Sequence, residues 1–362
     1  MRKILLALLC ALILSSGAAY AVTDVGTETE LQAVNAADMS GSYKMTADIT
    51  CTVNSDSGFT PIGSVSAFGG TFDGDGHKIK NLFINRQGET EVGLFKTTSG
   101  GTIKNAGLEN VSIAGGQHLG ALLGYSDGCT ISECFATGSV GGVTDIAAGL
   151  VGRSVNATTI TNCYSRCSIT AQGSQNGEFV GYIDAGTISK VYAAATISGT
   201  VGGLSVSTGI TQSYWDSTIG AATSGSGTGK TTTEMKTEST FTDPIASGVV
   251  NVAYDGDMYM DWVVTRVSGT SFDGMWMENI TIDGTSYAIS MVLDGDHMIS
   301  SCQSTLSGVA YSYGTGWDFT NIWNIDTTGV INDGYPYLRN VLPSSSGSGT
   351  STKRKPIVVW WN

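Results

Sequence analysis

A recurring apolar phrase organises the first part of the chain. Short glycine-flanked apolar segments are each followed, a few residues later, by an isoleucine usually preceded by threonine, and then in most copies by alternating apolar and polar residues. Those isoleucines recur about every 28 residues, with a shorter last interval, at Ile103, Ile131, Ile160, Ile188 and Ile210. Alternation with a period of two is typical of strands. A fixed period of this size is typical of repeat architectures, in which each unit buries its apolar face only against its neighbours.

The repeat therefore predicts an all-β fold, a right-handed parallel β-helix with one coil per repeat and a ladder of stacked isoleucines. Glycines in segments such as Gly149-Leu150-Val151-Gly152 fit tight corners or the close approach of successive coils. They do not fit a phosphate-binding loop, because no helix start follows them and no lysine completes that motif.

The ends of such a stack need covers, since terminal coils otherwise expose apolar faces and strand edges. Thr27 and Glu30 have the spacing of a capping box just before Leu31, which predicts a short amphipathic helix over the first coil. Residues 43–49 and 72–82 are expected to form the first strands, the latter around a tight Asp-Gly turn.

A different pattern occupies residues 241–313. Strand-like runs at 262–265, 275–282 and 287–292 are interspersed with Asp-Gly pairs that favour hairpin turns, so a smaller antiparallel β unit is expected. Its aromatic and methionine side chains favour a small hydrophobic core over a binding face. The predicted organisation is a signal peptide at 1–21, a solenoid at 22–219, a loop or linker at 220–240, the inserted β unit with a closing segment at 241–342, and a flexible tail at 343–362.

The N-terminus has the features of an export signal. Arg2 and Lys3 precede the apolar run 4–14, and Ala19-Tyr20-Ala21 has the small-x-small form of a cleavage site. This apolar run is too short to span a bilayer, and no later segment is long enough either. We expect a secreted, extracellular or cell-surface protein without a membrane span.

Composition and charge narrow the possible partners. The chain has 49 glycines, only 5 prolines and 14% charged residues, which suits many short strands joined by tight turns. Its net charge of −13 repels phosphate backbones, so nucleic acid is not expected as a partner. The basic cluster Lys353, Arg354 and Lys355 lies in the predicted tail, where solvation explains it.

Six cysteines would remain after signal cleavage: Cys51, Cys129, Cys134, Cys163, Cys167 and Cys302. An even number in an exported chain permits disulfides. Cys134 and Cys163 occupy equivalent positions in successive repeats, which suits either a ladder of buried thiols or a bridge between coils, and the connectivity stays open. Zinc is disfavoured because the close cysteine spacings lack a nearby histidine.

Two acidic turns are the candidates for chemistry. Enzymes of the β-helix class that degrade polysaccharides need carboxylates converging on one face, and such groups occur at Asp73, Asp75 and His77 and at Asp294, Asp296 and His297. Asp-Gly steps also make tight turns for purely structural reasons. No Gly-x-Ser-x-Gly segment accompanies the histidines, so no catalytic residue is predicted.

Two of the acidic segments contain groups of the kind that bind calcium. Asp73-Gly74-Asp75-Gly76 and Asp255-Gly256-Asp257 offer hard oxygen ligands. Neither extends into a twelve-residue loop that ends in glutamate. No metal or cofactor site is predicted.

Several segments together resemble the GLUG-motif repeat proteins. The resemblance covers about residues 28–240 and resumes at 317–338; it rests on Leu31, Asp48-Ile49, Pro61-Ile62-Gly63, Phe72-Asp73-Gly74-Asp75-Gly76-His77, Asn81-Leu82, the Gly-Leu-Val-Gly units, Tyr214-Trp215-Asp216, Trp323-Asn324-Ile325 and Gly334-Tyr335-Pro336-Tyr337-Leu338. That family occurs in bacterial and archaeal surface and secreted proteins, including adhesin-like chains and immunoglobulin A peptidases. The resemblance implies a β-solenoid on a cell surface and no catalytic residue, because the motif is architectural.

The expected function is that of a non-enzymatic, adhesin-like surface protein. Exposed Ser, Thr, Asn and Tyr side chains on the coil faces would contact a cell, matrix, glycan or protein ligand through weak, repeated contacts. Two alternatives stay open, a β-helix enzyme that degrades polysaccharides and a passive component of an envelope or matrix. Asn110, Asn156 and Asn279 begin glycosylation sequons, which matter only in a host that glycosylates.

Overall fold

The computed structural model describes residues 22–53, 56–142, 146–171, 175–198, 201–207, 210–220, 226–242, 246–250, 280–282, 285–287, 290–294, 297–301, 309–313 and 317–345. The predicted signal peptide, Cys302, the run at 262–265 and the basic cluster at 353–355 lie outside these residues. The chain forms two compact units, one containing residues 1–238 and 320–362, the other Ser239–Phe319.

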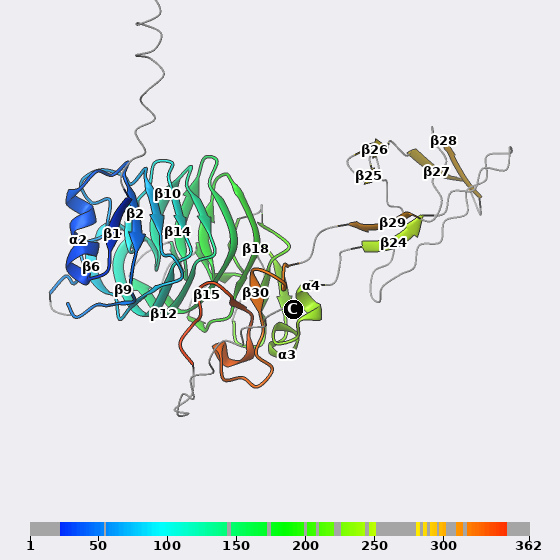
Figure 1. Cartoon of the computed structure of the whole chain (residues 1–362). Helices are drawn as coiled ribbons and strands as arrows, with labels where there is room; N and C mark the ends of the chain where they lie inside the picture. Colours follow the sequence, from blue (N-terminus) through cyan, green and yellow to red (C-terminus); the bar gives the residue numbers. More distant parts are fainter. Residues whose placement is uncertain are drawn as a thin grey trace, which may run out of the picture. The chain divides into compact units, whose positions relative to one another are not determined.

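The first unit is a parallel β-solenoid, as predicted (Figure 1). Its strands are β1 (Val22–Val25), β2 (Ser42–Met45), β3 (Ile49–Thr50), β4 (Thr71–Asp73), β5 (Lys78–Lys80), β6 (Phe83–Val92), β7 (Phe95–Thr97), β8 (Thr102–Lys104), β9 (Gly107–Gly120), β10 (Leu123–Asp127), β11 (Thr130–Ser132), β12 (Phe135–Gly142), β13 (Ala147–Ala148), β14 (Val151–Val155), β15 (Thr159–Ala171), β16 (Asn176–Gly177), β17 (Val180–Ile183), β18 (Thr187–Ala193), β19 (Ile197–Ser198), β20 (Val201–Gly202), β21 (Ile210–Thr211), β22 (Tyr214–Asp216), β23 (Thr228–Lys230), β30 (Trp323–Asn324) and β31 (Tyr337–Leu338). Strands β7, β10, β14 and β17 form one parallel sheet, and the other solenoid strands form a second. Strands β30 and β31 pair antiparallel.

The predicted isoleucine ladder is confirmed. Ile131 pairs in register with Ile103 and Ile160, and Ile188 pairs with Ile160 and Ile210. The first four of these are fully buried. Because side chains alternate across a strand, the residues on either side of each isoleucine point out of the coil.

A left-handed corner follows each ladder position. Asn105, Glu133, Asn162, Lys190 and Gln212 all have φ between 48° and 55°. Asparagine tolerates this conformation better than most side chains. The repeated corner ends each short ladder strand at the same place, so the outward residues of successive coils stay aligned.

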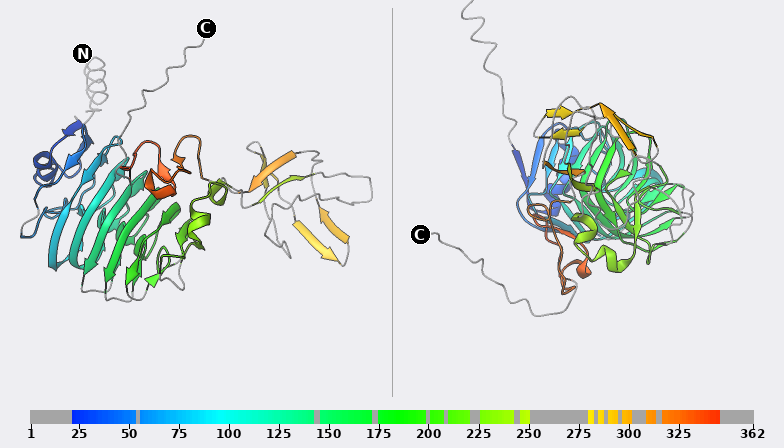
Figure 2. Two further views of the ribbon diagram at one scale, coloured as in Figure 1. Left: turned by 90° about the horizontal axis from the view of Figure 1, so that it is seen from below. Right: turned by 90° about the vertical axis from the view of Figure 1, so that its right-hand side faces the viewer.

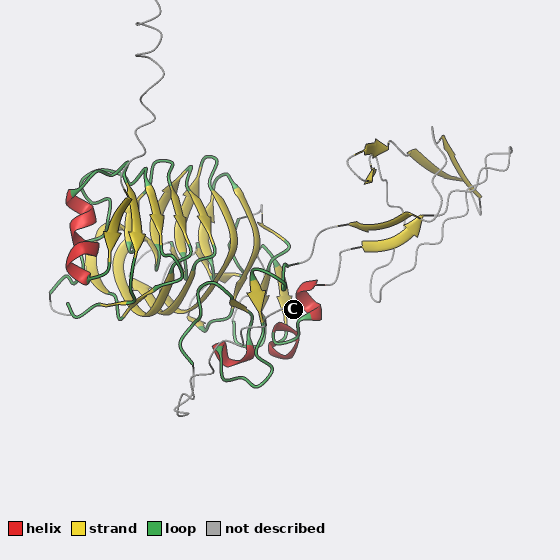
Figure 3. Ribbon diagram, in the orientation of Figure 1, coloured by secondary structure: helices red, strands yellow, loops and turns green. Residues whose placement is uncertain are grey.

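The helices are few and short (Figure 3). The predicted N-terminal cap is confirmed as α2 (Glu28–Ala33), where the Thr27 hydroxyl accepts a hydrogen bond from the Glu30 N–H and Leu31 is buried. A 3-10 turn (Val34–Ala36) follows, and another occurs at Asn332–Gly334. None of the helices in the described part of the chain has the length and apolar character needed to cross a bilayer.

Within the segment 220–240, predicted as a loop or linker, the structure contains a short strand and short helices. Strand β23 pairs with β22, and α3 (Thr232–Met235) follows with a complete capping box between Thr231 and Glu234. The glycine-rich composition suggested a linker, but the backbone hydrogen bonds offered by the last coil recruit this segment as a further strand.

A C-terminal strap, residues 320–345, lies along the coils (orange to red in Figure 2). The Trp323 indole N–H donates to the Asn162 side chain at 3.3 Å, and the Tyr335 hydroxyl donates to Asp216 at 2.6 Å. Towards the other end, the Ser344 hydroxyl donates to Glu109 at 2.6 Å. The strap thus connects the last coil to a coil near the N-terminus.

The strap covers a stack of outward-facing rings. Phe135, Tyr164 and Tyr192 stack with centroid separations of 4.8 and 5.0 Å and nearly parallel planes. All three are fully buried, although they stand outside the interior core, and Trp323 lies against both tyrosines. The closing segment therefore has its own hydrophobic contact with the coils.

The second unit confirms the predicted antiparallel pairing in the insertion. It contains α4 (Ser239–Thr242), β24 (Ala246–Val250), β25 (Ile280–Ile282), β26 (Thr285–Tyr287), β27 (Ser290–Asp294), β28 (His297–Ser301) and β29 (Val309–Tyr313). Strand β24 pairs with β29, β25 with β26, and β27 with β28. Of the run expected as a strand at 287–292, Tyr287 lies in β26 and residues 290–292 lie in β27.

The described cysteines are free thiols: Cys51, Cys129, Cys134, Cys163 and Cys167. The Cys163 sulfur donates to the Thr161 carbonyl at 3.2 Å and accepts from the Cys134 N–H at 3.4 Å. Ser213 has the same role two coils on, because its hydroxyl donates to the Thr211 carbonyl and accepts from the Val191 N–H. The Cys163 thiol therefore satisfies backbone groups at a coil corner.

We expect Cys163→Ala to destabilise the solenoid by about 1–3 kcal/mol beyond the loss of side-chain volume, because it leaves a buried N–H unpaired. Cys163→Ser should retain most of the stability, since a hydroxyl can replace the thiol as Ser213 shows. Urea unfolding would measure both, with Cys167→Ala as the volume control. A serine variant as unstable as the alanine variant would contradict this role.

Candidate binding surface

The outward residues that flank the isoleucine ladder form a surface rich in hydroxyl groups, here called the hydroxyl face. Its first row is Thr71, Thr102, Thr130, Thr159 and Thr187, and its second row is Ser132, Thr161, Ser189 and Thr211. Every side chain in both rows is at least partly exposed. Threonine suits this position because a β-branched side chain packs well on a pleated surface.

The rows are aligned by the strand register. Thr130 pairs with Thr102 on one side and with Thr159 on the other, and Thr159 pairs with Thr187. In the second row, Thr161 pairs with Ser132 and Ser189. Neighbouring coils are about 4.8 Å apart and the two rows about 6.6 Å apart, from the geometry of parallel strands. The hydroxyl face is therefore a regular grid.

The hydroxyls of this grid form no hydrogen bonds within the described part of the chain. Buried hydroxyls of the same solenoid behave differently: Ser126 and Thr158 bond each other at 3.0 Å, and Ser213 bonds the Thr211 carbonyl. Each hydroxyl of the face can therefore donate and accept a hydrogen bond to water or a ligand.

Charge is confined to one end of the second row. There Asp73 and Lys104 occupy the positions that Ser132 and Thr161 occupy in later coils, and they form an ion pair at 3.1 Å. The positions from Thr130 onward carry no charged side chain. The face thus offers a neutral hydrogen-bonding surface with methyl groups beside the hydroxyls.

A second outward row provides a comparison, here called the serine row: Ser112, Ser139, Ser168 and Thr196. Ser139 pairs in register with Ser112 and Ser168. The Thr196 hydroxyl donates to Ser168 at 3.2 Å, so part of the hydrogen-bonding capacity of this row is already used.

The turn at Asp73, Asp75 and His77 holds ion pairs rather than a free carboxylate pair. Asp75 pairs with Lys44 at 3.0 Å, and the His77 imidazole lies 3.4 Å from Asp48. The Asp73 carboxylate accepts from the Asp75 N–H at 2.9 Å, the tight-turn contact expected of an Asp-Gly segment.

The electrostatics of Asp73 do not suit a proton donor. Burial alone would raise the pKa of this carboxyl, but hydrogen bonds from the Asp75 N–H and Asn105, together with Lys104, lower the pKa below its ordinary value. A lowered pKa favours the ionised carboxylate, whereas the general acid of glycan cleavage has to hold a proton.

The other candidates for chemistry fall largely outside what the structure describes. Asp294 lies opposite His297 in the β27–β28 pair, but their side chains, like Asp296 and the segment 255–257, are outside the described residues. Among the side chains that are described, no three His, Cys, Asp or Glu residues converge as a possible metal site.

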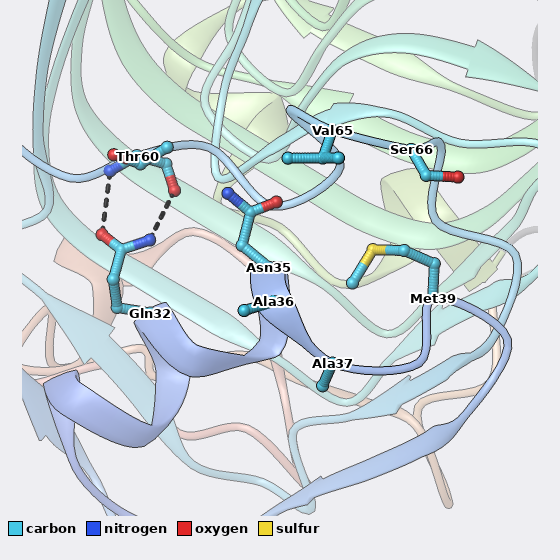
Figure 4. A pocket seen from close by; sticks show the side chains of 8 residues that line it. All are labelled: Gln32, Asn35, Ala36, Ala37, Met39, Thr60, Val65 and Ser66. Atoms are coloured by element: carbon cyan, nitrogen blue, oxygen red, sulfur yellow. Dashed lines mark hydrogen bonds between the residues drawn. The ribbon is translucent and has the colours of Figure 1, made fainter.

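A shallow pocket lies between the N-terminal cap and the segment 60–66 (Figure 4). The Gln32 side chain exchanges two hydrogen bonds of 2.9 Å with the Thr60 backbone, and Asn35 accepts from the Gly63 and Ser64 N–H groups. The amides are thus used to hold the cap on the coil. No titratable side chain lines this pocket.

One buried carboxyl is unusual for its place in the repeat. Glu178 is in register with Gly203 in the next coil, and the corresponding residue in the preceding repeat is Gly149. It is fully buried and neither carboxyl oxygen has a hydrogen-bond partner in the described residues. Burial, and secondarily the charge of Asp216, raises the pKa of Glu178 to about 9.

Asp216 connects several parts of the last coil. Its carboxylate accepts from the Thr218 N–H, the Thr232 hydroxyl and the Tyr335 hydroxyl at 2.6–3.0 Å. It therefore joins the last coil to helix α3 and to the strap. A protonated Glu178 carries no charge and therefore does not repel the Asp216 carboxylate. The protonation state of Glu178 thus affects the last coil of the solenoid rather than the hydroxyl face.

The sequence indicated hydroxyl-rich coil faces in general but did not single out this one. The available signal was a threonine directly before four of the five ladder isoleucines, and a Ser or Thr directly after four of them. Alternation along a strand makes such a pair point to the same side.

Comparison with known proteins gives limited matches. No family model matches the chain. Halomucin from Haloquadratum walsbyi is 37% identical over 142 residues, which are 36% of this chain, and the match spans only 2% of the length of halomucin. The crystal structure of a candidate immunoglobulin A1 protease from Bacteroides ovatus aligns over 59% of this chain and 85% of that chain, with 19% identity and a TM-score of 0.43.

We expect the free energy of unfolding to fall as pH rises from about 4.5 towards 9, by up to about 1.4 kcal/mol per pH unit from Glu178 alone. The sign follows because the folded state holds this proton to a higher pH than the unfolded state does. Chemical denaturation at several pH values would show it as a difference from Glu178→Gln, which lacks the titrating group. Identical pH dependence in both proteins would contradict the assignment.

Proposed function

We propose that this chain is a non-enzymatic extracellular or cell-surface protein of the GLUG-motif type, which makes adhesive contacts through the hydroxyl face. The observation that carries the proposal is the grid of exposed hydroxyls without internal partners, repeated in register over successive coils. Repetition favours many weak contacts made together, because binding at one position raises the effective concentration at the next.

Three further observations support it. The N-terminal sequence has the form of an export signal. The likeness to halomucin is to a protein whose name places it among mucin-like molecules. In the sequence-predicted acidic turn, Asp73 and Asp75 are held in ion pairs with lysines.

Cell-binding measurements test the proposal. The protein without residues 1–21 should bind a panel of cells or matrix preparations saturably, and Thr130→Lys with Thr187→Lys should weaken that binding at least tenfold, by placing bulky charges on the face. Ser112→Lys with Ser139→Lys adds the same charge to the serine row and should bind as the unaltered protein does. Equal loss in both double variants, or no saturable binding to any surface, would overturn the proposal.

The polysaccharide-degrading alternative has its own test. Incubation of the protein with a panel of polysaccharides should release no shortened products. Product release that disappears in Asp73→Ala or Asp294→Ala would show the enzyme instead.

A further inference from the structure

We infer that the hydroxyl face binds a neutral polysaccharide whose chain runs along the solenoid axis, across the rows of successive coils. This inference rests on the proposed function and names the partner class for the same surface. It follows from three properties of the face: its chemistry, its lack of charge and its period.

The chemistry of the face complements that of a sugar. Each threonine presents a hydroxyl that donates and accepts hydrogen bonds, with a methyl group beside it. A pyranose ring presents the same two features, hydroxyls at its edge and apolar C–H groups on its face. The hydroxyls of Thr130, Thr159 and Thr187 have no internal partner to give up, so binding replaces only hydrogen bonds to water.

Charge favours a neutral polymer over an acidic one. The part of the face from Thr130 onward carries no lysine or arginine that could pair with carboxylates or sulfates. Lys104, at one end of the second row, is paired with Asp73, and Lys190 lies at the corner that follows Ser189. The net charge of −13 adds a general repulsion of anionic polymers.

The period favours a polymer over a single sugar. Successive threonines of the first row are related by one coil, about 4.8 Å, a length comparable with one sugar residue in an extended chain. The described rows contain no aromatic side chain on which a ring could stack, so the contact with any one sugar is weak. Affinity must then come from several coils acting together, and it should increase with the length of the glycan.

The test is binding of the protein without residues 1–21 to soluble polysaccharides, measured by affinity gel electrophoresis and calorimetry. The neutral probes are a mannan, a xylan, a galactan and a β-glucan, and the anionic probes are alginate and hyaluronan. We expect at least one neutral polymer to bind, its fragments to bind more tightly as they lengthen, and the anionic polymers not to bind.

The decisive variant is Thr130→Val with Thr159→Val and Thr187→Val, which removes the hydroxyls but keeps the shape and strand preference of the side chains. We expect its affinity to fall at least tenfold. The control, Ser168→Ala with Thr196→Val on the serine row, removes two hydroxyls that already bond each other and should bind unchanged. Circular dichroism and melting temperature should show that both variants fold as the parent does.

Several outcomes would overturn the inference. One is preferential binding of the anionic polymers, and another is undiminished binding by the triple valine variant. A third is concentration-dependent self-association that the triple valine variant abolishes, because the face would then bind a second copy of the chain. If cells bind through the face but no polysaccharide does, the partner class is wrong and the proposed function stands. If neither cells nor polysaccharides bind, both are wrong.

Discussion

Hydrogen bonding between parallel, in-register coils is the interaction on which the rest of this solenoid depends. Each coil provides the strand edge for the next, and register fixes which side chains meet. A shift of one residue would turn Ile131 outward and Thr130 into the core. The buried ladder penalises that shift strongly, because a core position would then hold an unpaired hydroxyl and the surface an isoleucine.

The same register makes the outer surface regular. Since the isoleucines are stacked, their neighbours must stack as well, and the hydroxyl face follows from the core without additional interactions. The left-handed corners at Asn105 and its equivalents end each ladder strand at the same point. Regularity of the core is thus converted into regularity of the hydroxyl face.

Segments outside the repeats cover the apolar surfaces of the first unit that the stacked coils alone would leave exposed. Helix α2 covers the first coil, and helix α3 and the strap both contact Asp216 in the last coil. The strap also buries the stacked rings of Phe135, Tyr164 and Tyr192, which would otherwise be an exposed apolar row. The hydroxyl face has no such cover in the described residues, a contrast that matches its polar composition.

The solenoid, the isoleucine ladder, the N-terminal cap and the antiparallel pairing in the insertion could all be predicted from the amino-acid sequence. Each depends on local signals: spacing, alternation, capping residues and Asp-Gly turns. The sequence also indicated that the coil faces would be rich in hydroxyls. The other features of the structure depend on contacts between residues that lie far apart in the chain. Glycine-rich composition concealed β23, because pairing with β22 outweighs local preference.

The pairing of Asp73 with Lys104 and of Asp75 with Lys44 could not be predicted from the sequence, since those partners come from other coils; the folded structure showed it. It alone showed which hydroxyls lack partners, because Thr196 meets Ser168 only when the coils stack. It also showed that Glu178 is buried without a partner, because the last coil closes over it. Local pattern fixes which way a side chain points, whereas its partners depend on how the coils assemble.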